Sequence, residues 1–483
     1  MKAAVTTGRT NYFWTGLALF AAAGWLWISW CRVPASSWND LRLTAVFMGA
    51  QGEPVYTLPG AGVLTTWMYG PVPLWLWSPA VLARDAVSAV LAAGAINLLL
   101  ALAALGATCL LWPSANARPS DRWLALALTC LIWPEPAFRF LQADNLLVAL
   151  GLAANLVLAL TPPSARRRWL AALATAAALG CKPTALALLL AQLVWLFRAE
   201  GARSASFHLG RTLLTGGALA AAAVAQFGWR ELWFGAVTVP ARLPWADAPW
   251  VRLADLAPHL AVQGGAALLV LLAFGRALRR ESRALELPMI AWGVALPFGL
   301  AGILTTGGTT NNLHGFQWLL PAVLVAALGL ARQRWTLAPA FAAGIAAVLL
   351  SARLATTDHL PLRPATARLH AADQIARAAP DATWLPWAPL VGYFASGRFD
   401  HTEDGIYVRF ITGHPVSFAQ AHAHLPPHFT ALVLPGDGAD WGLAAKLAPP
   451  PLTIDEIGGW RVLRWEKPVP LHNRTSAPPP VHP

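Results

Sequence analysis

Charged side chains are scarce in this sequence. Asp, Glu, Lys and Arg together make up 12% of its 483 residues, whereas soluble domains carry about 25%. Hydrophobic residues reach 57%, and 25 residues are tryptophan. This composition excludes an ordinary water-soluble protein and predicts a polytopic α-helical membrane protein. A helix that crosses a bilayer needs roughly 17–25 apolar residues, and stretches with little or no charge lie at 13–30, 86–112, 144–161, 212–228, 259–275, 287–306, 315–330 and 336–351.

Other signals are missing as well. No small-residue cleavage site follows Trp30, so the first apolar stretch is predicted to be a membrane anchor rather than a cleavable signal peptide. The chain has no repeat of fixed period and few charges within its predicted spans, whereas a transporter is expected to show paired repeats and charges inside spans. With four cysteines, the sequence supplies no disulfide framework.

The cations that are present collect in alternate loops. Because cationic loops stay on the cytoplasmic side, they predict a cytoplasmic N-terminus, about eleven membrane crossings and an outer C-terminal region. The net charge of +12 is therefore interpreted as a topology signal, and nucleic-acid binding is not expected. The predicted cytoplasmic cations are Lys2, Arg9, Arg118, Arg122, Arg166, Arg167, Arg168, Arg198, Arg203, Arg211, Arg276, Arg279, Arg280, Arg283, Arg332 and Arg334.

Two interruptions break the apolar pattern. Residues 71–83 are apolar but too short to cross a bilayer, and they predict a helix lying at or dipping into the outer surface. Lys182-Pro183 separates two apolar runs whose far ends are cationic, so the chain is predicted to rise to the outer face, turn there and return. A simple kink at Pro183 is the alternative.

The composition changes after Ser351. Residues 363–379 fit an amphipathic helix, the segment PHFTALVLPG reads as a strand, and two further strands are joined across Gly458-Gly459 as a hairpin. We therefore expect a membrane module at 1–355, a small extracytoplasmic α/β domain at 356–468 and a disordered proline-rich tail at 469–483.

One carboxylate follows directly after the first span, in Trp38-Asn39-Asp40. Transfer of a sugar to a hydroxyl requires a base that takes the proton of the acceptor. At the outer water–lipid boundary, such a base can meet a sugar whose carrier tail stays in the bilayer. A solvated loop acid, or a helix cap for residues 41–50, is the alternative role for Asp40.

Lys182 is expensive to hold between two apolar half-helices unless an anion compensates its desolvation. A phosphate leaving group would do so, and the lysine would then stabilise the charge that develops on it during transfer. The alternative is that Lys182 extends to the lipid headgroups.

Further polar residues lie in the predicted outer loops. The segment from Glu135 to Asn145 carries Arg139 and two acids, but its arrangement is too loose to predict a metal site, and Asp144 or Asn145 is an equally good helix N-cap. The turn at 305–316 supplies Asn311 and His314, which could donate hydrogen bonds to sugar hydroxyls or phosphate oxygens, although turn formation alone explains its glycines and asparagines.

Tyr69 lies in Trp67-Met68-Tyr69-Gly70-Pro71-Val72-Pro73. Its hydroxyl and flat ring suit a sugar, while interfacial anchoring is the alternative role. His422, His424 and His428 lack a matching fourth zinc ligand. No metal site or cofactor is predicted, although the sequence leaves a divalent metal open.

These features resemble the GT-C superfamily of integral-membrane glycosyltransferases. The resemblance covers roughly residues 10–350: an aspartate in the first outer loop, the tyrosine-proline segment that ends this loop, and a glycine- and asparagine-rich turn before a span containing Pro321. Many members carry paired acids in the first loop, whereas here leucine follows Asp40 and Glu53 is the only other nearby carboxylate.

The resemblance implies a bacterial inner-membrane enzyme that moves a sugar from a polyprenyl-phosphate donor to a lipid, glycan or protein acceptor on the outer side, with inversion at the anomeric carbon. It implies Asp40 as the base and Lys182, with Arg139 and His314, as the residues that hold the donor phosphate. A polysaccharide ligase or polymerase, or a non-catalytic lipid or solute transporter, remains open.

Overall fold

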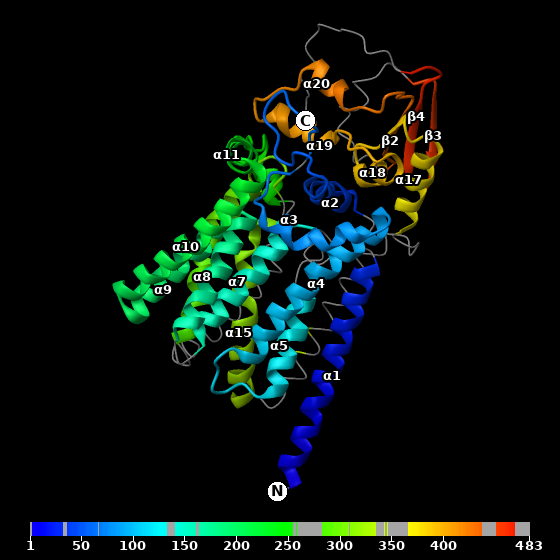
Figure 1. Cartoon of the computed structure of the whole chain (residues 1–483). Coiled ribbons are helices and arrows are strands. Elements are labelled where there is room, and N and C mark those ends of the chain that lie inside the picture. The colour runs from blue at the N-terminus through cyan, green and yellow to red at the C-terminus, as the bar shows by residue number, and fades with distance from the viewer. Residues whose placement is uncertain are drawn as a thin grey trace.

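The computed structural model describes residues 2–31, 36–65, 67–132, 141–160, 164–254, 283–308, 310–334, 366–436 and 451–468, together with residues 257, 342 and 345. These residues form a bundle of long helices with shorter helices and a small sheet at one end, opposite the N-terminus (Figure 1). The first half contains α1 (Lys2–Cys31), α2 (Ser37–Ala50), α3 (Val72–Trp77), η2 (Ser78–Leu82), α4 (Ala86–Leu111), α5 (Pro119–Ile132), α7 (Ala143–Ala159), α8 (Ala165–Cys181), η3 (Pro183–Ala185), α9 (Leu186–Glu200) and α10 (Ala202–Phe227). The next group is α11 (Trp229–Trp233), η4 (Phe234–Thr238), α12 (Val239–Ala241), η5 (Arg283–Leu285), α14 (Glu286–Ile303), η6 (Thr310–Leu313) and α15 (Gly315–Arg334).

Four described helices are long and apolar enough to cross a membrane: Tyr12–Cys31, Ala86–Leu111, Pro183–Glu200 and Arg283–Ile303. The pair Ala202–Phe227 and Trp229–Ala241, bent by 112°, would be a fifth if it is one span. The chain is therefore a multi-pass membrane protein. The predicted spans at 259–275 and 336–351 lie almost entirely outside the described residues, so the expectation of about eleven crossings stays a prediction.

Helices α8 and α9 form a hairpin. The Ser164 side chain accepts a hydrogen bond from the Arg167 amide and so caps the start of α8, and the helix ends at Cys181. Thr175 of α8 donates to Gln192 of α9 at 2.8 Å, and Arg168 pairs with Glu200 at the far ends of the two helices. The predicted turn at Lys182-Pro183 and return are confirmed, and the alternative of a simple kink is wrong. The position of this turn at the outer face stays a prediction.

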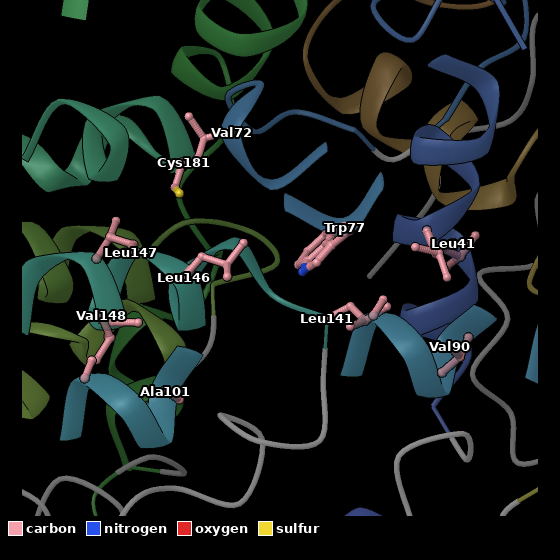
Figure 2. Close-up of a cluster of buried hydrophobic side chains, with 14 of the residues drawn as sticks. Leu41, Val72, Trp77, Val90, Ala101, Leu141, Leu146, Leu147, Val148 and Cys181 are labelled. Carbon is pink, nitrogen blue, oxygen red and sulfur yellow. The ribbon is translucent and has the colours of Figure 1, made fainter. Parts of the chain in front are cut away.

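The apolar segment 71–83 forms the short helices α3 and η2. In Figure 1 they run across the ends of the long helices. Trp77 of α3 is fully buried and its indole nitrogen donates to Asn97 of α4 at 2.7 Å. Figure 2 shows the buried cluster below this crossing, where Trp77 lies between Leu41 of α2 and Leu146 of α7. Burial of these apolar groups fixes α2, α3 and α7 relative to one another.

The C-terminal part contains a four-stranded sheet in the order β1-β2-β4-β3, in which β1 is parallel to β2 and the other pairs are antiparallel. Gly458 and Gly459 connect β3 to β4 with φ angles of 59° and 84°, a conformation that favours glycine in hairpin turns. The predicted helix, strand and hairpin are confirmed. The elements are α17 (Thr366–Ala378), β1 (Thr383–Trp384), α18 (Pro389–Ser396), α19 (Glu403–Ile411), α20 (Phe418–Ala423), β2 (Ala431–Pro435), β3 (Thr453–Ile457) and β4 (Trp460–Arg464).

This part packs on the loop that follows α2. The Thr402 amide donates to the Leu64 carbonyl at 2.9 Å, and the Leu64 amide donates to Nδ1 of His401 at 2.9 Å. Both histidine and threonine are buried. The predicted domain boundary near residue 355 and the tail at 469–483 lie outside the described residues.

Candidate active site

Asp144 is the centre of a polar cluster at the end of the bundle that carries the sheet. It lies in the first turn of α7, and its carboxylate is 3.0 Å from Nζ of Lys182, at the turn between α8 and α9. Asn311 of η6 donates to its other oxygen at 2.9 Å, and Nδ1 of His314 lies 3.5 Å from Oδ1. The structure thus brings together three residues proposed from the sequence, Lys182, Asn311 and His314, around a carboxylate.

The Lys182–Asp144 pair is mostly shielded from solvent, with side-chain exposures of 17% for the lysine and 3% for the aspartate. A lysine in such surroundings is stabilised only if its charge and its donors are matched. Here the ammonium also donates to Oδ1 of Asn312 at 2.9 Å. The Lys182 side chain thus retains some solvent exposure beside this pair.

The turn that carries Asn311, Asn312 and His314 lies against α14. A side chain at Gly302 would meet the Asn312 side chain at 2.8 Å, so the absence of one lets the turn approach the helix. The buried His314 ring packs edge-on against Trp318 of α15, with the ring centres 5.1 Å apart. Packing against both helices α14 and α15 therefore fixes the turn beside Asp144.

The loop that carries Tyr69 contacts the turn that carries Lys182 through backbone atoms. The Gly70 amide donates to the Cys181 carbonyl at 3.0 Å, and a Cβ on Gly70 would lie 2.0 Å from the Gly180 carbonyl oxygen. The Tyr69 carbonyl accepts from the Tyr56 hydroxyl at 2.8 Å. The loop carrying Tyr69 thus contacts the turn that presents Lys182, and glycine at position 70 permits this approach.

Asp40 lies in α2 and is fully buried. Its Oδ1 accepts a hydrogen bond from the Leu390 amide at the start of α18, 2.8 Å away, so the alternative role as a cap of its own helix is wrong. Within the described part of the chain, Oδ2 has no hydrogen-bond partner. Burial raises the pKa of Asp40 to about 7, although the amides of Leu390 and Val391 oppose the rise.

A hydrogen bond links the segment of Asp40 to the segment of Asp144. Asn39 accepts from the Leu141 amide at 2.7 Å, two residues before α7 begins at Ala143. Helix α2 and the start of α7 are therefore held together. Arg139, the remaining residue proposed from the sequence, lies outside the described residues.

From the sequence we interpreted Asp144 as a loop acid or a helix cap. In the structure it lies at the centre of the polar cluster with Lys182, Asn311 and His314. Gln142 is the N-cap of α7, and the Asp144 side chain instead binds Lys182 and Asn311. Asp144 starts a long uncharged stretch of the sequence, and this position could have indicated its role. Acids within membrane segments usually pair with another charged group and mark a functional site. Among the described residues, no group of three or more His, Cys, Asp and Glu side chains is arranged to hold a metal ion.

Comparisons with known proteins bear on the fold. No family model matches the chain, and no curated protein does. The structure of ArnT from Cupriavidus metallidurans bound to undecaprenyl phosphate superposes with a TM-score of 0.57 at 12% identity, covering 96% of this chain and 99% of that one. The apo state of ArnT gives the same TM-score and identity over 94% and 98% of the two chains.

This chain has the GT-C fold. The archaeal oligosaccharyltransferase AglB from Archaeoglobus fulgidus, in complex with an inhibitory peptide and a dolichol-phosphate, is a more distant match, with a TM-score of 0.49 at 12% identity over 89% of this chain and 70% of that one. Because the ArnT superposition spans nearly the whole of both chains, the GT-C architecture includes the C-terminal part as well as the helical bundle.

Proposed function

We propose that this chain is a membrane glycosyltransferase that moves a sugar from a polyprenyl-phosphate donor to an acceptor hydroxyl. The observation that carries the proposal is the partly exposed side chain of Lys182, whose ammonium binds Asp144 and Asn312, in the fold of a protein crystallised with undecaprenyl phosphate. A fixed cation that retains some solvent access is suited to a phosphate group.

The proposed chemistry is a displacement at the anomeric carbon. The acceptor oxygen attacks this carbon, the bond from the carbon to the phosphate oxygen breaks, and the polyprenyl phosphate leaves with the electron pair. Lys182 stabilises the negative charge that grows on the leaving phosphate. Attack on the face opposite the leaving group inverts the configuration.

Asp40 is proposed as the base that takes the proton of the acceptor. Its pKa of about 7 suits this role, because proton transfer is most effective when the pKa of the base lies near the working pH. In this structure the start of α18 covers the carboxyl group. The proposal therefore requires the segment around Leu390 to move when the acceptor binds.

The proposed setting is a bacterial inner membrane, with the N-terminus in the cytoplasm and the site on the outer side. Nucleotide sugars are not normally supplied there, so a sugar made inside must arrive on a membrane carrier. The lipid tail of that carrier would lie in the bilayer beside the apolar helices. Arg139, Tyr69 and His314 are proposed to contact the donor or the sugar.

The test is a transfer assay with purified protein in lipid nanodiscs. Polyprenyl-phosphate sugars are expected to donate to an acceptor, and nucleotide sugars are expected to be ignored. Efficient use of a nucleotide sugar would contradict the carrier-lipid donor. Movement of a solute across sealed vesicles, with no glycosidic bond formed from any donor, would identify a transporter instead.

A further inference from the structure

Another cation lies against the loop that leads to Tyr69. Arg409 of α19 is only 8% exposed. Its Nη2 donates to the carbonyl and hydroxyl oxygens of Thr57 at 2.6 and 3.0 Å, and its guanidinium lies 4.6 Å from the ring centre of Phe234 in η4. Within the described residues, Nη1 is buried without a hydrogen-bond partner.

A histidine contacts the same aromatic ring, and a second arginine contacts that histidine. The His414 ring packs edge-on against Phe234, with the centres 4.9 Å apart, and Arg242 approaches Nε2 of His414 at 3.1 Å. Burial, together with the charges of Arg242 and Arg409, lowers the pKa of His414. No carboxylate of the described part of the chain forms an ion pair with Arg242 or Arg409.

We propose that Arg409 and His414, which both contact Phe234, together with Arg242, which contacts His414, bind an oxyanion, a phosphate or carboxylate group, on the acceptor substrate. This oxyanion subsite rests on the proposed glycosyl transfer and adds the chemical class of the acceptor. It is separate from the Lys182 site, which is proposed for the donor.

The chemistry of the cluster favours an anion. A buried guanidinium nitrogen without an acceptor is unfavourable by more than an ordinary lost hydrogen bond, because the group is charged. The neighbouring Arg242 adds a second positive charge rather than a counter-ion. An oxyanion would fill the open donor positions of Arg409, whose planar fork suits phosphate and carboxylate, and it would offset the mutual repulsion.

The position of the cluster fits an acceptor. Arg409 is bonded to Thr57, the neighbouring Tyr56 donates to the Tyr69 carbonyl, and Gly70 donates to the residue before Lys182. A single loop, residues 56–70, therefore connects the oxyanion subsite to the donor site. Arg242 is exposed, so this part of the subsite is open to solvent.

The test measures pyrophosphate binding by calorimetry to the full-length protein in phosphatidylcholine nanodiscs, in a Lys182→Ala background that removes the donor-site cation. This background is expected to retain one binding event. Adding Arg242→Gln should weaken it about tenfold, and adding Arg409→Gln should weaken it further. Arg230→Gln, an exposed arginine on the same bent segment, is the matched control and should leave the affinity unchanged. Equal affinity with and without Arg242→Gln would overturn the subsite.

Arg242→Gln is the decisive variant, because this exposed side chain can change without removing the bonds of Arg409 to Thr57. Repeating the titration with phosphatidylglycerol in the nanodisc separates the sources of the anion. Competition by the lipid identifies a lipid-borne acceptor, and its absence identifies a soluble one. In the transfer assay, Arg242→Gln should raise the acceptor KM about tenfold and leave the donor KM unchanged. If no transfer occurs but pyrophosphate still binds as predicted, the proposed transfer fails while the anion site stands.

Discussion

Nζ of Lys182 lies 3.0 Å from Oδ1 of Asp144, although 38 residues separate them in the chain. The contact joins the turn between α8 and α9 to the first turn of α7. Both side chains also bind the turn between α14 and α15, Lys182 through Asn312 and Asp144 through Asn311. This ion pair therefore lies at the centre of a cluster that also contains Asn311, Asn312 and His314.

The first prediction concerns the strength of this pair. Asp144→Ala should destabilise the protein by less than the roughly 3–5 kcal/mol that a fully buried pair can lose, because Lys182 is 17% exposed. A double-mutant cycle with Lys182→Ala, followed by thermal unfolding in detergent, should give a coupling free energy above about 1 kcal/mol.

The exposed pair Arg377–Asp373 on α17 serves as the control for this cycle, because surface pairs contribute about 0.5 kcal/mol or less. A coupling for Lys182–Asp144 as small as that of the control would show that the pair does not organise the site.

The second prediction concerns Asp40→Asn. This change keeps the size and one oxygen of the side chain and removes the ability to take a proton. Loss of a general base typically lowers the rate by about 10²–10⁴. The wild-type rate should rise as the pH increases through about 7 and then level off, and this dependence should vanish in the variant. A well-folded Asp40→Asn protein with nearly normal transfer would remove Asp40 from the mechanism.

The third prediction concerns the effect of the Asp40 carboxyl group on the pH dependence of folding stability, which is measured independently of catalysis. Its pKa is raised from 3.8 to about 7, so between these values the folded protein holds a proton that the unfolded chain has lost. The contribution of Asp40 to stability is therefore fully present below about pH 4 and is lost as the pH rises through about 7. Asp40→Asn should flatten this part of the stability profile, measured by thermal unfolding between pH 4 and pH 8. An unchanged profile would mean that Asp40 titrates normally.

The fourth prediction concerns Gly70. A Cβ at this position would lie 2.0 Å from the Gly180 carbonyl oxygen, so the backbone must shift. Gly70→Ala should destabilise the protein by about 1–3 kcal/mol and weaken donor use. Gly106→Ala is the control, since a Cβ at that position would have no atom within 4 Å outside its own helix backbone. Equal stability of the two variants would show that the Tyr69 loop does not need this close approach.

Local patterns in the sequence predicted much of the fold. The hairpin of α8 and α9 follows from an apolar run with cationic ends and a central Lys182-Pro183, and the β-hairpin follows from Gly458-Gly459. Contacts between distant segments could not be predicted in this way. The Asp40 carboxyl is covered by the Leu390 amide, 350 residues later, and Lys182 meets Asn312 across 130 residues. Lys182, Asn311 and His314 were proposed from the sequence one by one, but their common partner Asp144 emerged only from the packing.

The fifth prediction concerns topology. Reporter fusions should place residues 167 and 280 in the cytoplasm and residues 40, 182 and 400 outside. A cytoplasmic residue 40 would put the proposed base in the wrong compartment and end the mechanism.

The central claim is that Lys182 holds the phosphate of a polyprenyl carrier. It is tested most directly by titrating undecaprenyl phosphate into purified wild-type protein, Lys182→Ala and Lys182→Arg, with the exposed Lys467→Ala as the control. Lys182→Ala should bind the lipid phosphate at least tenfold more weakly, Lys182→Arg should retain part of the affinity because the positive charge survives, and Lys467→Ala should match the wild type. Wild-type affinity in both Lys182 variants would contradict the account.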